Sequence, residues 1–201
     1  MNYNEYSKIE GITKSELDLI HKSIAHWKCD ERREATEAME IGSALHAAVF
    51  EPEEFGANYI VSPSVDKRTK AGKEEWEKFL AANEHKTVLS SDSNLLVMKM
   101  ADAIKNHPVA SHLVSNGMAE TPFQWTDKSG IKCKCKPDYI RNDGVLIDLK
   151  TTADCSPDAF QRSIYNFRYH VQAAFYMDGI GIASGTPVND FVLIAIEKSA
   201  P

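Results

Sequence analysis

Apolar residues in the first half of the chain recur with a helical period. Three segments have this pattern, at about residues 13–24, 35–49 and 93–106. Thr13 or Ser15 can cap the first helix, and the second stops before Glu51-Pro52 because a residue before proline avoids the helical region. Residues 1–110 are therefore predicted to be mainly helical.

The second half has the shorter period of strands. Strands are predicted at residues 120–125, 131–136, 145–150 and 190–196, with one helix from about Pro157 to Met177. Residues 131–136 alternate apolar side chains with lysines, which predicts a half-buried strand with a lysine face and with Cys133 and Cys135 buried. The order predicts an α+β (α/β) fold with an N-terminal helical region.

Length and composition indicate one folded domain. The chain has 201 residues, 43% of them hydrophobic and 26% charged, which is typical of globular proteins. We expect a single domain over 1–201, with a mainly helical part at 1–110 and a sheet-and-helix part at 118–201. The longest apolar run, Phe191–Ile196, is far below the roughly 18–20 residues of a membrane span, and the N-terminus is polar. A cytoplasmic protein without membrane contact is expected.

The formal charge of −6 lies in one part of the chain. Residues 1–60 contain six bases and twelve acids, whereas residues 61–201 are neutral. Within the neutral part, one basic group lies on a predicted exposed loop at 61–75, before a short helix at 74–82, and consists of Lys67, Arg68, Lys70 and Lys73. These side chains could contact DNA phosphates or could be an ordinary solvated surface, and the pattern leaves both open. Lys134 and Lys136 are further candidates for DNA contact.

The segment from Lys136 to Lys150 contains the candidate chemistry. If residues 142–144 form a three-residue hairpin loop, Arg141 faces Val145 and Asp138 lies opposite Asp148. Two carboxylates facing each other across a sheet repel, and an unpaired charge in a buried strand is costly. A divalent cation such as Mg²⁺, which prefers oxygen ligands, would remove this repulsion.

Lys150 projects from the same face of its strand as Asp148, two residues earlier. An ammonium group beside a metal-bound water can position that water and stabilise negative charge on phosphorus. Two acids and a lysine are thus suited to phosphodiester hydrolysis. The alternative is structural: Asp148 would be a salt-bridged residue and Lys150 a solvated strand end.

Several motifs together resemble a nuclease superfamily. Pro137-Asp138 followed by Asp148-Leu149-Lys150 resembles the signature of PD-(D/E)XK nucleases. Gly42–His46 resembles the G-x-x-x-H motif of the RecB-like branch, and Gln172–Tyr176 its Q-x-x-x-Y motif. With residues 66–73, these stretches resemble the nuclease domain of RecE-type exonucleases (exonuclease VIII) over nearly the whole chain.

This resemblance implies a fold and an activity. The fold would be a restriction-endonuclease-like core, a mixed central sheet flanked by helices. The activity would be Mg²⁺-dependent 5′ to 3′ digestion of linear double-stranded DNA, with Mn²⁺ able to substitute, in phage or prophage recombination. Such enzymes form homo-oligomeric rings and act at double-stranded DNA ends with a RecT-type single-strand annealing protein.

The resemblance also assigns roles to residues. Asp138, Asp148 and the Leu149 carbonyl would hold metal, and Lys150 would serve the attacking water. The remaining assignments are His46 as a further ligand or orienting group, Glu120 as an additional acid that opens a strand, and Gln172 and Tyr176 near the scissile strand. Without the resemblance, His46 would be read as a hydrogen-bonded core residue, and Gln172 and Tyr176 as helix packing.

Related nucleases continue past the strand at Phe191–Ile196 with another strand and a helix, so the chain is expected to be shortened at its C-terminus relative to them. Two rival functions follow. One is an endonuclease or junction resolvase of the same superfamily. The other is a catalytically weak or inactive module that binds DNA or protein.

Overall fold

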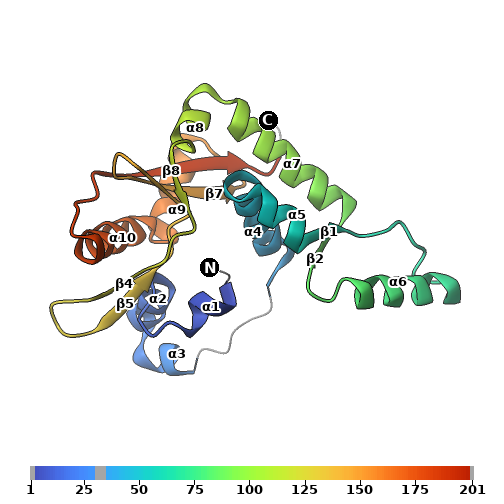
Figure 1. Ribbon diagram of the computed structural model, residues 1–201, viewed down its shortest axis with the longest axis horizontal. Coiled ribbons are helices and arrows are strands. Elements are labelled where there is room, and N and C mark those ends of the chain that lie inside the picture. The colour runs from blue at the N-terminus through green and yellow to red at the C-terminus, as the bar shows by residue number, and fades with distance from the viewer. Residues whose placement is uncertain (1–2, 30–34, 200–201) are drawn as a thin grey trace. The chain divides into compact units, whose positions relative to one another are not determined.

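The protein is described by a computed structural model that covers residues 3–29 and 35–199 (Figure 1). The helices are α1 (Tyr3–Lys8), α2 (Lys14–Lys22), α3 (Ile24–Lys28), α4 (Glu37–Phe50), α5 (Pro52–Asn58), α6 (Lys70–Ala82), α7 (Ser91–Asn106), α8 (Pro108–Leu113), α9 (Pro157–Asn166) and α10 (Tyr169–Ser184). The strands are β1 (Tyr59–Val61), β2 (Thr87–Leu89), β3 (Gly117–Ala119), β4 (Phe123–Thr126), β5 (Lys132–Cys135), β6 (Tyr139–Arg141), β7 (Val145–Thr152) and β8 (Asp190–Glu197). A mixed α+β chain is the predicted fold class, and it is confirmed.

Contacts divide the chain into two compact units. One unit comprises residues 1–35 and 107–201, and the other comprises residues 36–106. The N-terminal helices α2 and α3 thus belong with the sheet, although the sequence placed them with the helical part at 1–110. A single nuclease domain over 1–201 stays a prediction.

The sheet of the first unit is mixed, as predicted. Its strand order is β3-β6-β7-β8, in which β7 and β8 are parallel and the other pairs are antiparallel. The connection from β7 to β8 runs through α9 and α10, because parallel strands need a long crossover. The middle of β7, Leu146–Leu149, is fully buried, which explains its almost continuous apolar sequence.

The hairpin between β6 and β7 has the predicted register. Tyr139 pairs with Ile147 and Ile140 with Leu146. Gly144 adopts a φ of 82°, and its N–H donates to the Arg141 carbonyl at 3.0 Å. Glycine reaches this left-handed conformation without a steric penalty, so it closes the loop that sets the register.

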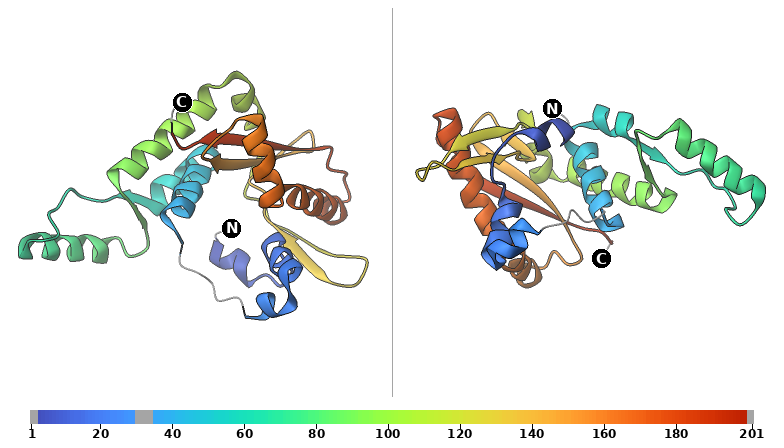
Figure 2. Two further views of the ribbon diagram at one scale, coloured as in Figure 1. Left: turned by 180° about the vertical axis from the view of Figure 1, so that it is seen from behind. Right: turned by 90° about the horizontal axis from the view of Figure 1, so that it is seen from below.

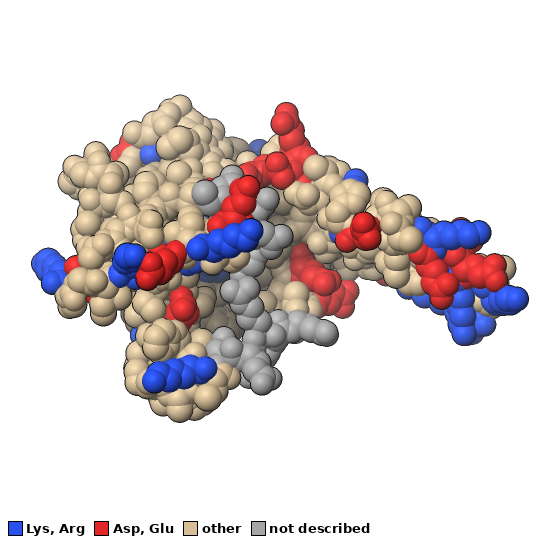
Figure 3. Space-filling model, turned by 60° about the horizontal axis from the view of Figure 1, so that its bottom comes forward, with Lys and Arg blue, Asp and Glu red and all other residues tan. Residues whose placement is uncertain are grey.

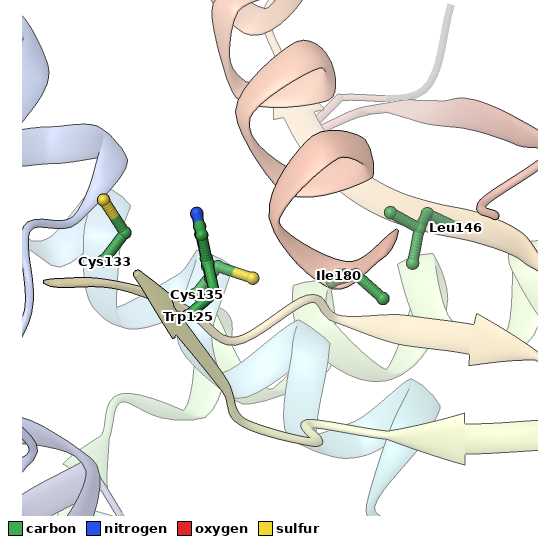
Figure 4. Close-up of a cluster of buried hydrophobic side chains, with 5 residues drawn as sticks. All are labelled: Trp125, Cys133, Cys135, Leu146 and Ile180. Atoms are coloured by element: carbon green, nitrogen blue, oxygen red, sulfur yellow. The ribbon is translucent and has the colours of Figure 1, made fainter. Parts of the chain in front are cut away.

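A second hairpin, β4–β5, packs on α10. The buried residues between these elements and β7 are Trp125, Cys133, Cys135, Leu146 and Ile180 (Figure 4). The two cysteines are therefore core residues, as predicted. Gly179 on α10 lies directly against the indole ring of Trp125, so the absence of a side chain there allows the close approach of helix and hairpin.

The N-terminal segment continues this packing along β5. Ile12 forms a parallel bridge with Cys133, through bonds to Lys132 and Lys134. Thr13 caps α2 with a capping box that involves Glu16, as the sequence predicted for one of its two candidates. The helix ends earlier than expected, because Ser23 is extended and caps a separate helix, α3.

Two predictions for the first unit are wrong. The single helix expected at 157–177 is two helices, α9 and α10, which lie at an angle to each other (Figure 2). Arg168, between them, has a φ of 54° and ends the regular helical path. Glu120 does not open a strand: it follows β3, has a φ of 48°, and precedes β4.

In the second unit, α4 packs against α7, and β1 pairs in parallel with β2. The loop expected at 61–75 is shorter than predicted, because α6 begins at Lys70. Thr69 caps this helix by accepting from the Gly72 N–H at 3.0 Å. No helix among the described residues is both long enough and apolar enough to span a membrane.

Candidate functional site

The candidate site is centred on Asp148, a buried carboxylate in the middle of β7. Its residue is 2% exposed, so its charge needs partners within the protein. Lys150 Nζ lies 2.5 Å from Asp148 Oδ2, and Gln172 Nε2 donates to Asp148 Oδ1, also at 2.5 Å. Both carboxylate oxygens therefore have a partner, an ion pair from the same strand and a hydrogen bond from α10.

Asp138 reaches the same place from the other arm of the hairpin. Its Oδ2 accepts a hydrogen bond from the Leu149 N–H at 2.7 Å, which fixes the carboxylate against β7. Pro137, which precedes it, is fully buried and anchors this turn of the chain. The predicted convergence of Asp138, Asp148 and Lys150 is thus observed, because the hairpin register places them there.

The two carboxylates hold Lys150 in its charged form. Burial by itself lowers the pKa of this amine, but the charges of Asp148 and then Asp138 outweigh burial, so the pKa is raised. An ammonium with one charge between two carboxylates leaves a net negative site. Such a site is suited to attract a divalent cation.

Gln172 and Tyr176 lie one turn apart on α10 and both face this site. Gln172 is buried, and its amide bonds Asp148 as described above. The pKa of the Tyr176 hydroxyl is raised well above its usual value, first by burial and then by Cys135, Asp138 and Asp148. Gln172 thus contacts the strand that bears Asp148, whereas a role of Tyr176 in the site stays a prediction.

Glu120 adds a third acid near Asp138. A carboxylate oxygen of each lies within 4.8 Å of the other, and the Glu120 N–H donates to the Asp138 carbonyl at 3.1 Å. Lys136 Nζ lies 2.5 Å from Glu120 Oε2. The left-handed backbone of Glu120, rather than a strand start, brings its side chain to this position.

His46 lies on α4 in the second unit. It is half-buried and packs edge-on against Phe50, with ring centroids 6.0 Å apart. Gly42 lies one turn earlier on the same helix, so the Gly42–His46 motif is helical as expected. Participation of His46 in metal binding stays a prediction.

The donor set suits a hard divalent cation. Asp138, Asp148 and Glu120 offer carboxylate oxygens, which are the ligands that Mg²⁺ and Mn²⁺ prefer in proteins. No thiol lies among these donors, since Cys133 and Cys135 belong to the apolar core and the pKa of Cys135 is raised by burial to about 12. The chemistry of the residues therefore fits Mg²⁺, with the Leu149 carbonyl as a predicted further ligand.

The lysine face predicted for β5 is open only in part, since Lys132 is exposed whereas Lys134 is buried. Lys134 is 6% exposed, and its ammonium donates to three backbone carbonyls at 2.5–3.3 Å, those of Tyr6, Ser7 and Ile9. Contact of Lys134 and Lys136 with DNA stays a prediction, although Lys136 pairs with Glu120 and both ammonium groups have partners within the protein. The sequence could not show the burial of Lys134, because the acceptors come from residues more than 120 positions away.

Three of the four basic side chains at Lys67–Lys73 have local partners. Lys67 Nζ lies 3.2 Å from the centre of the Trp76 ring, and Arg68 bonds Asp66 at 3.0 Å. Lys70 lies 4.0 Å from Glu74 along α6. Figure 3 shows basic and acidic side chains interleaved around α6, at the right of the view. Contact of this group with DNA stays a prediction.

One contact of the site was not expected. Lys150 Nζ lies 4.9 Å from the centre of the Tyr169 ring, in the first turn of α10. In the sequence, the one signal for this contact is that residues 157–177 are rich in aromatic side chains.

Comparisons with known proteins agree with this geometry. A family model described as "PDDEXK-like domain of unknown function (DUF3799)" matches residues 6–201. Among solved structures, the chain is similar to a "Putative exonuclease" from Eubacterium rectale, with a TM-score of 0.64 and 13% identity, over 98% of this chain and 72% of that one. No curated protein matches the chain.

Proposed function

The chain belongs to this PDDEXK-like family, DUF3799, and on that basis we propose that it is a metal-dependent deoxyribonuclease. The observation that carries the proposal is that Asp138 reaches β7 beside Asp148 and Lys150. Gln172 is bonded to Asp148 there. A buried acid pair with an adjacent ammonium is costly for a structural role, because each charge must be desolvated.

The side chains have separable tasks in this proposal. Asp138 and Asp148 would hold Mg²⁺ or Mn²⁺ with the Leu149 carbonyl, His46 and Glu120. The ion supplies Lewis-acid activation of water and of the phosphate. Gln172 keeps the Asp148 carboxylate oriented, which fixes the donor geometry. The Lys150 ammonium donates to the attacking water or to the phosphate oxygens and stabilises the charge that develops there.

We further propose that the substrate is linear double-stranded DNA, digested 5′ to 3′ in phage-type recombination. The resemblance to RecE-type nucleases supports this, and the name of the similar solved structure, "Putative exonuclease", supports only the exonuclease activity. A RecT-type annealing partner and a ring of subunits are part of the same proposal. They rest on the resemblance alone.

The test is digestion of end-labelled linear duplex with a 5′ phosphate in Mg²⁺. Asp148→Asn and Lys150→Ala should each lower the rate by about 100-fold or more, since each removes a group that acts at the reacting phosphate. Asp190→Asn is the matched control, an exposed acid at the start of the neighbouring strand β8, and should digest like the wild type.

Circular dichroism should show that each variant is folded. Wild-type rates in folded Asp148→Asn would refute the nuclease assignment. Absence of digestion by the wild type, with metal bound, would instead favour a binding module. Cleavage of closed circular DNA would replace the exonuclease by an endonuclease, because an exonuclease needs an end.

A further inference from the structure

Aromatic rings gather where α9 meets α10. The group, called here the aromatic cluster, consists of Phe160, Tyr165, Phe167, Tyr169 and His170. Tyr165 is 76% exposed and Phe167 60% exposed, and His170 is also exposed. Single exposed rings are ordinary, but contiguous exposed aromatic groups are typical of binding surfaces.

Four rings of the cluster form two near-parallel pairs. Tyr165 and His170 have centroids 6.3 Å apart with planes at 16°, and Phe167 and Tyr169 have centroids 5.6 Å apart with planes at 22°. In each pair the ring faces turned away from the partner are flat surfaces. This arrangement matches flat ligands such as nucleobases, which stack on aromatic side chains.

The turn that carries the rings is held in place. Arg168 has a left-handed backbone between the two helices, and its Nε lies 3.0 Å from Asp18 Oδ1 on α2. Lys14 Nζ, also on α2, donates to the Phe167 carbonyl at 2.7 Å. The backbone that carries the exposed rings is therefore held before any ligand binds, which reduces the entropic cost of ordering this turn.

The cluster is continuous with the candidate site. Tyr169 stacks on Phe167, and the Lys150 ammonium lies 4.9 Å from the centre of the Tyr169 ring. Lys150 is in turn bonded to Asp148. The rings thus lead from solvent to the residues that would act on the phosphate.

We propose that the aromatic cluster stacks the bases of an unpaired DNA strand and leads that strand to Lys150. This inference rests on the proposed nuclease function and specifies the form in which its substrate enters. Bases in a duplex have their faces covered by their neighbours, so terminal base pairs must open before they can stack on the cluster. Recognition through ring faces is independent of sequence, since every base has such a face.

The first experiment separates base stacking from phosphate attraction. Fluorescence anisotropy compares an oligo-dT with an abasic oligonucleotide of the same length and charge, with Ca²⁺ in place of Mg²⁺. The wild type should bind the oligo-dT at least about tenfold more tightly. The double variant Tyr165→Ala/Phe167→Ala should lose most of this preference, whereas Tyr165→Phe/Phe167→Tyr, which keeps both rings, should retain it.

Ile182→Ala is the matched control, because Ile182 is an exposed apolar residue on α10 outside the cluster, and it should bind like the wild type. Equal wild-type affinity for the two oligonucleotides would overturn the proposal. So would an undiminished preference in the folded alanine variant, which would leave the cluster as a contact for another protein.

A second experiment distinguishes failure of this proposal from failure of the proposed nuclease function. The wild type should cleave a duplex with a short unpaired end faster than a blunt duplex, and the alanine variant should lose this advantage. Base-dependent binding without any cleavage would refute the nuclease function and leave the stacking surface standing. Cleavage by the wild type with no dependence on the rings or on an unpaired end would refute the stacking surface alone.

Discussion

Asp148 illustrates how single residues of this protein balance burial against charge. A carboxylate with 2% exposure persists because Lys150 and Gln172 each satisfy one of its oxygens. Removing one partner leaves a charge that the surroundings cannot solvate, which typically costs several kcal/mol. Lys150 therefore contributes to the stability of β7 as well as to the proposed chemistry, and folding controls are needed for any Lys150 variant.

Cys135 gives a pH-dependent test of the core. Burial raises the pKa of its thiol from 9.0 to about 12. Its contribution to stability is complete below pH 9 and is lost as the pH rises toward 12, because the unfolded chain releases the proton first. Between pH 8 and pH 10 the wild type should lose about 1.4 kcal/mol more unfolding free energy than Cys135→Ala.

Urea unfolding of both proteins at several pH values measures this difference. Titrating groups that do not interact with Cys135 are shared by the two proteins and cancel in the comparison; Tyr176, whose pKa Cys135 raises, is the exception. A gap between wild type and variant that stays constant up to pH 10 would show that Cys135 is not shielded from water as the structure describes.

Residue-level prediction succeeded where contacts are local in sequence. Asp138 and Asp148 could be paired from the sequence because one short loop fixes the register between them. The burial of Lys134 could not, because its ammonium is surrounded by carbonyls of a segment at the other end of the chain. An alternating pattern shows which residues share a face, but not what covers that face.

The helix α10 has two roles. It carries Gln172 and Tyr176, and it packs on the β4–β5 hairpin. Its closest approach is at Gly179, where an added Cβ would collide with the Trp125 ring. Gly179→Ala should therefore destabilise the protein by about 1–3 kcal/mol, even though alanine favours helix by roughly 1 kcal/mol.

Gly181→Ala, two residues later, is the matched control. Its added Cβ would meet only the Thr186 carbonyl at 3.8 Å, an ordinary contact. This variant should gain up to about 1 kcal/mol from helix propensity. Thermal unfolding of the two variants should shift in opposite directions, and a stabilised Gly179→Ala would contradict the close packing of α10 on Trp125.

The elements that were predicted best have a clear period of apolar residues and a proline or glycine that marks one of their ends. The helix α4 ends before Pro52, and β7 is preceded by the turn at Gly144. The break between α9 and α10 was missed because Arg168 adopts a left-handed conformation that glycine usually marks. The start of α6 was missed because residues 61–75 have no apolar period, although Thr69 caps the helix.

At the scale of the whole molecule, charge opposes the proposed substrate. The chain has a formal net charge of −6, and the candidate site brings together three carboxylates, those of Glu120, Asp138 and Asp148. DNA phosphates are repelled by such a surface unless cations intervene. Since Lys134 and Lys136 are held within the protein, the field near the site depends on what the carboxylates bind.

Binding of duplex DNA should therefore require a divalent cation. With Ca²⁺ in place of Mg²⁺, the dissociation constant for a short duplex should be at least about tenfold lower than in EDTA, because the ion neutralises the carboxylates and contacts phosphate. In Asp138→Asn/Asp148→Asn the effect of Ca²⁺ should largely vanish, while binding in EDTA should strengthen as repulsion falls. Anisotropy titrations at fixed ionic strength measure both. Equal wild-type affinity in Ca²⁺ and in EDTA would mean that DNA is bound away from these carboxylates.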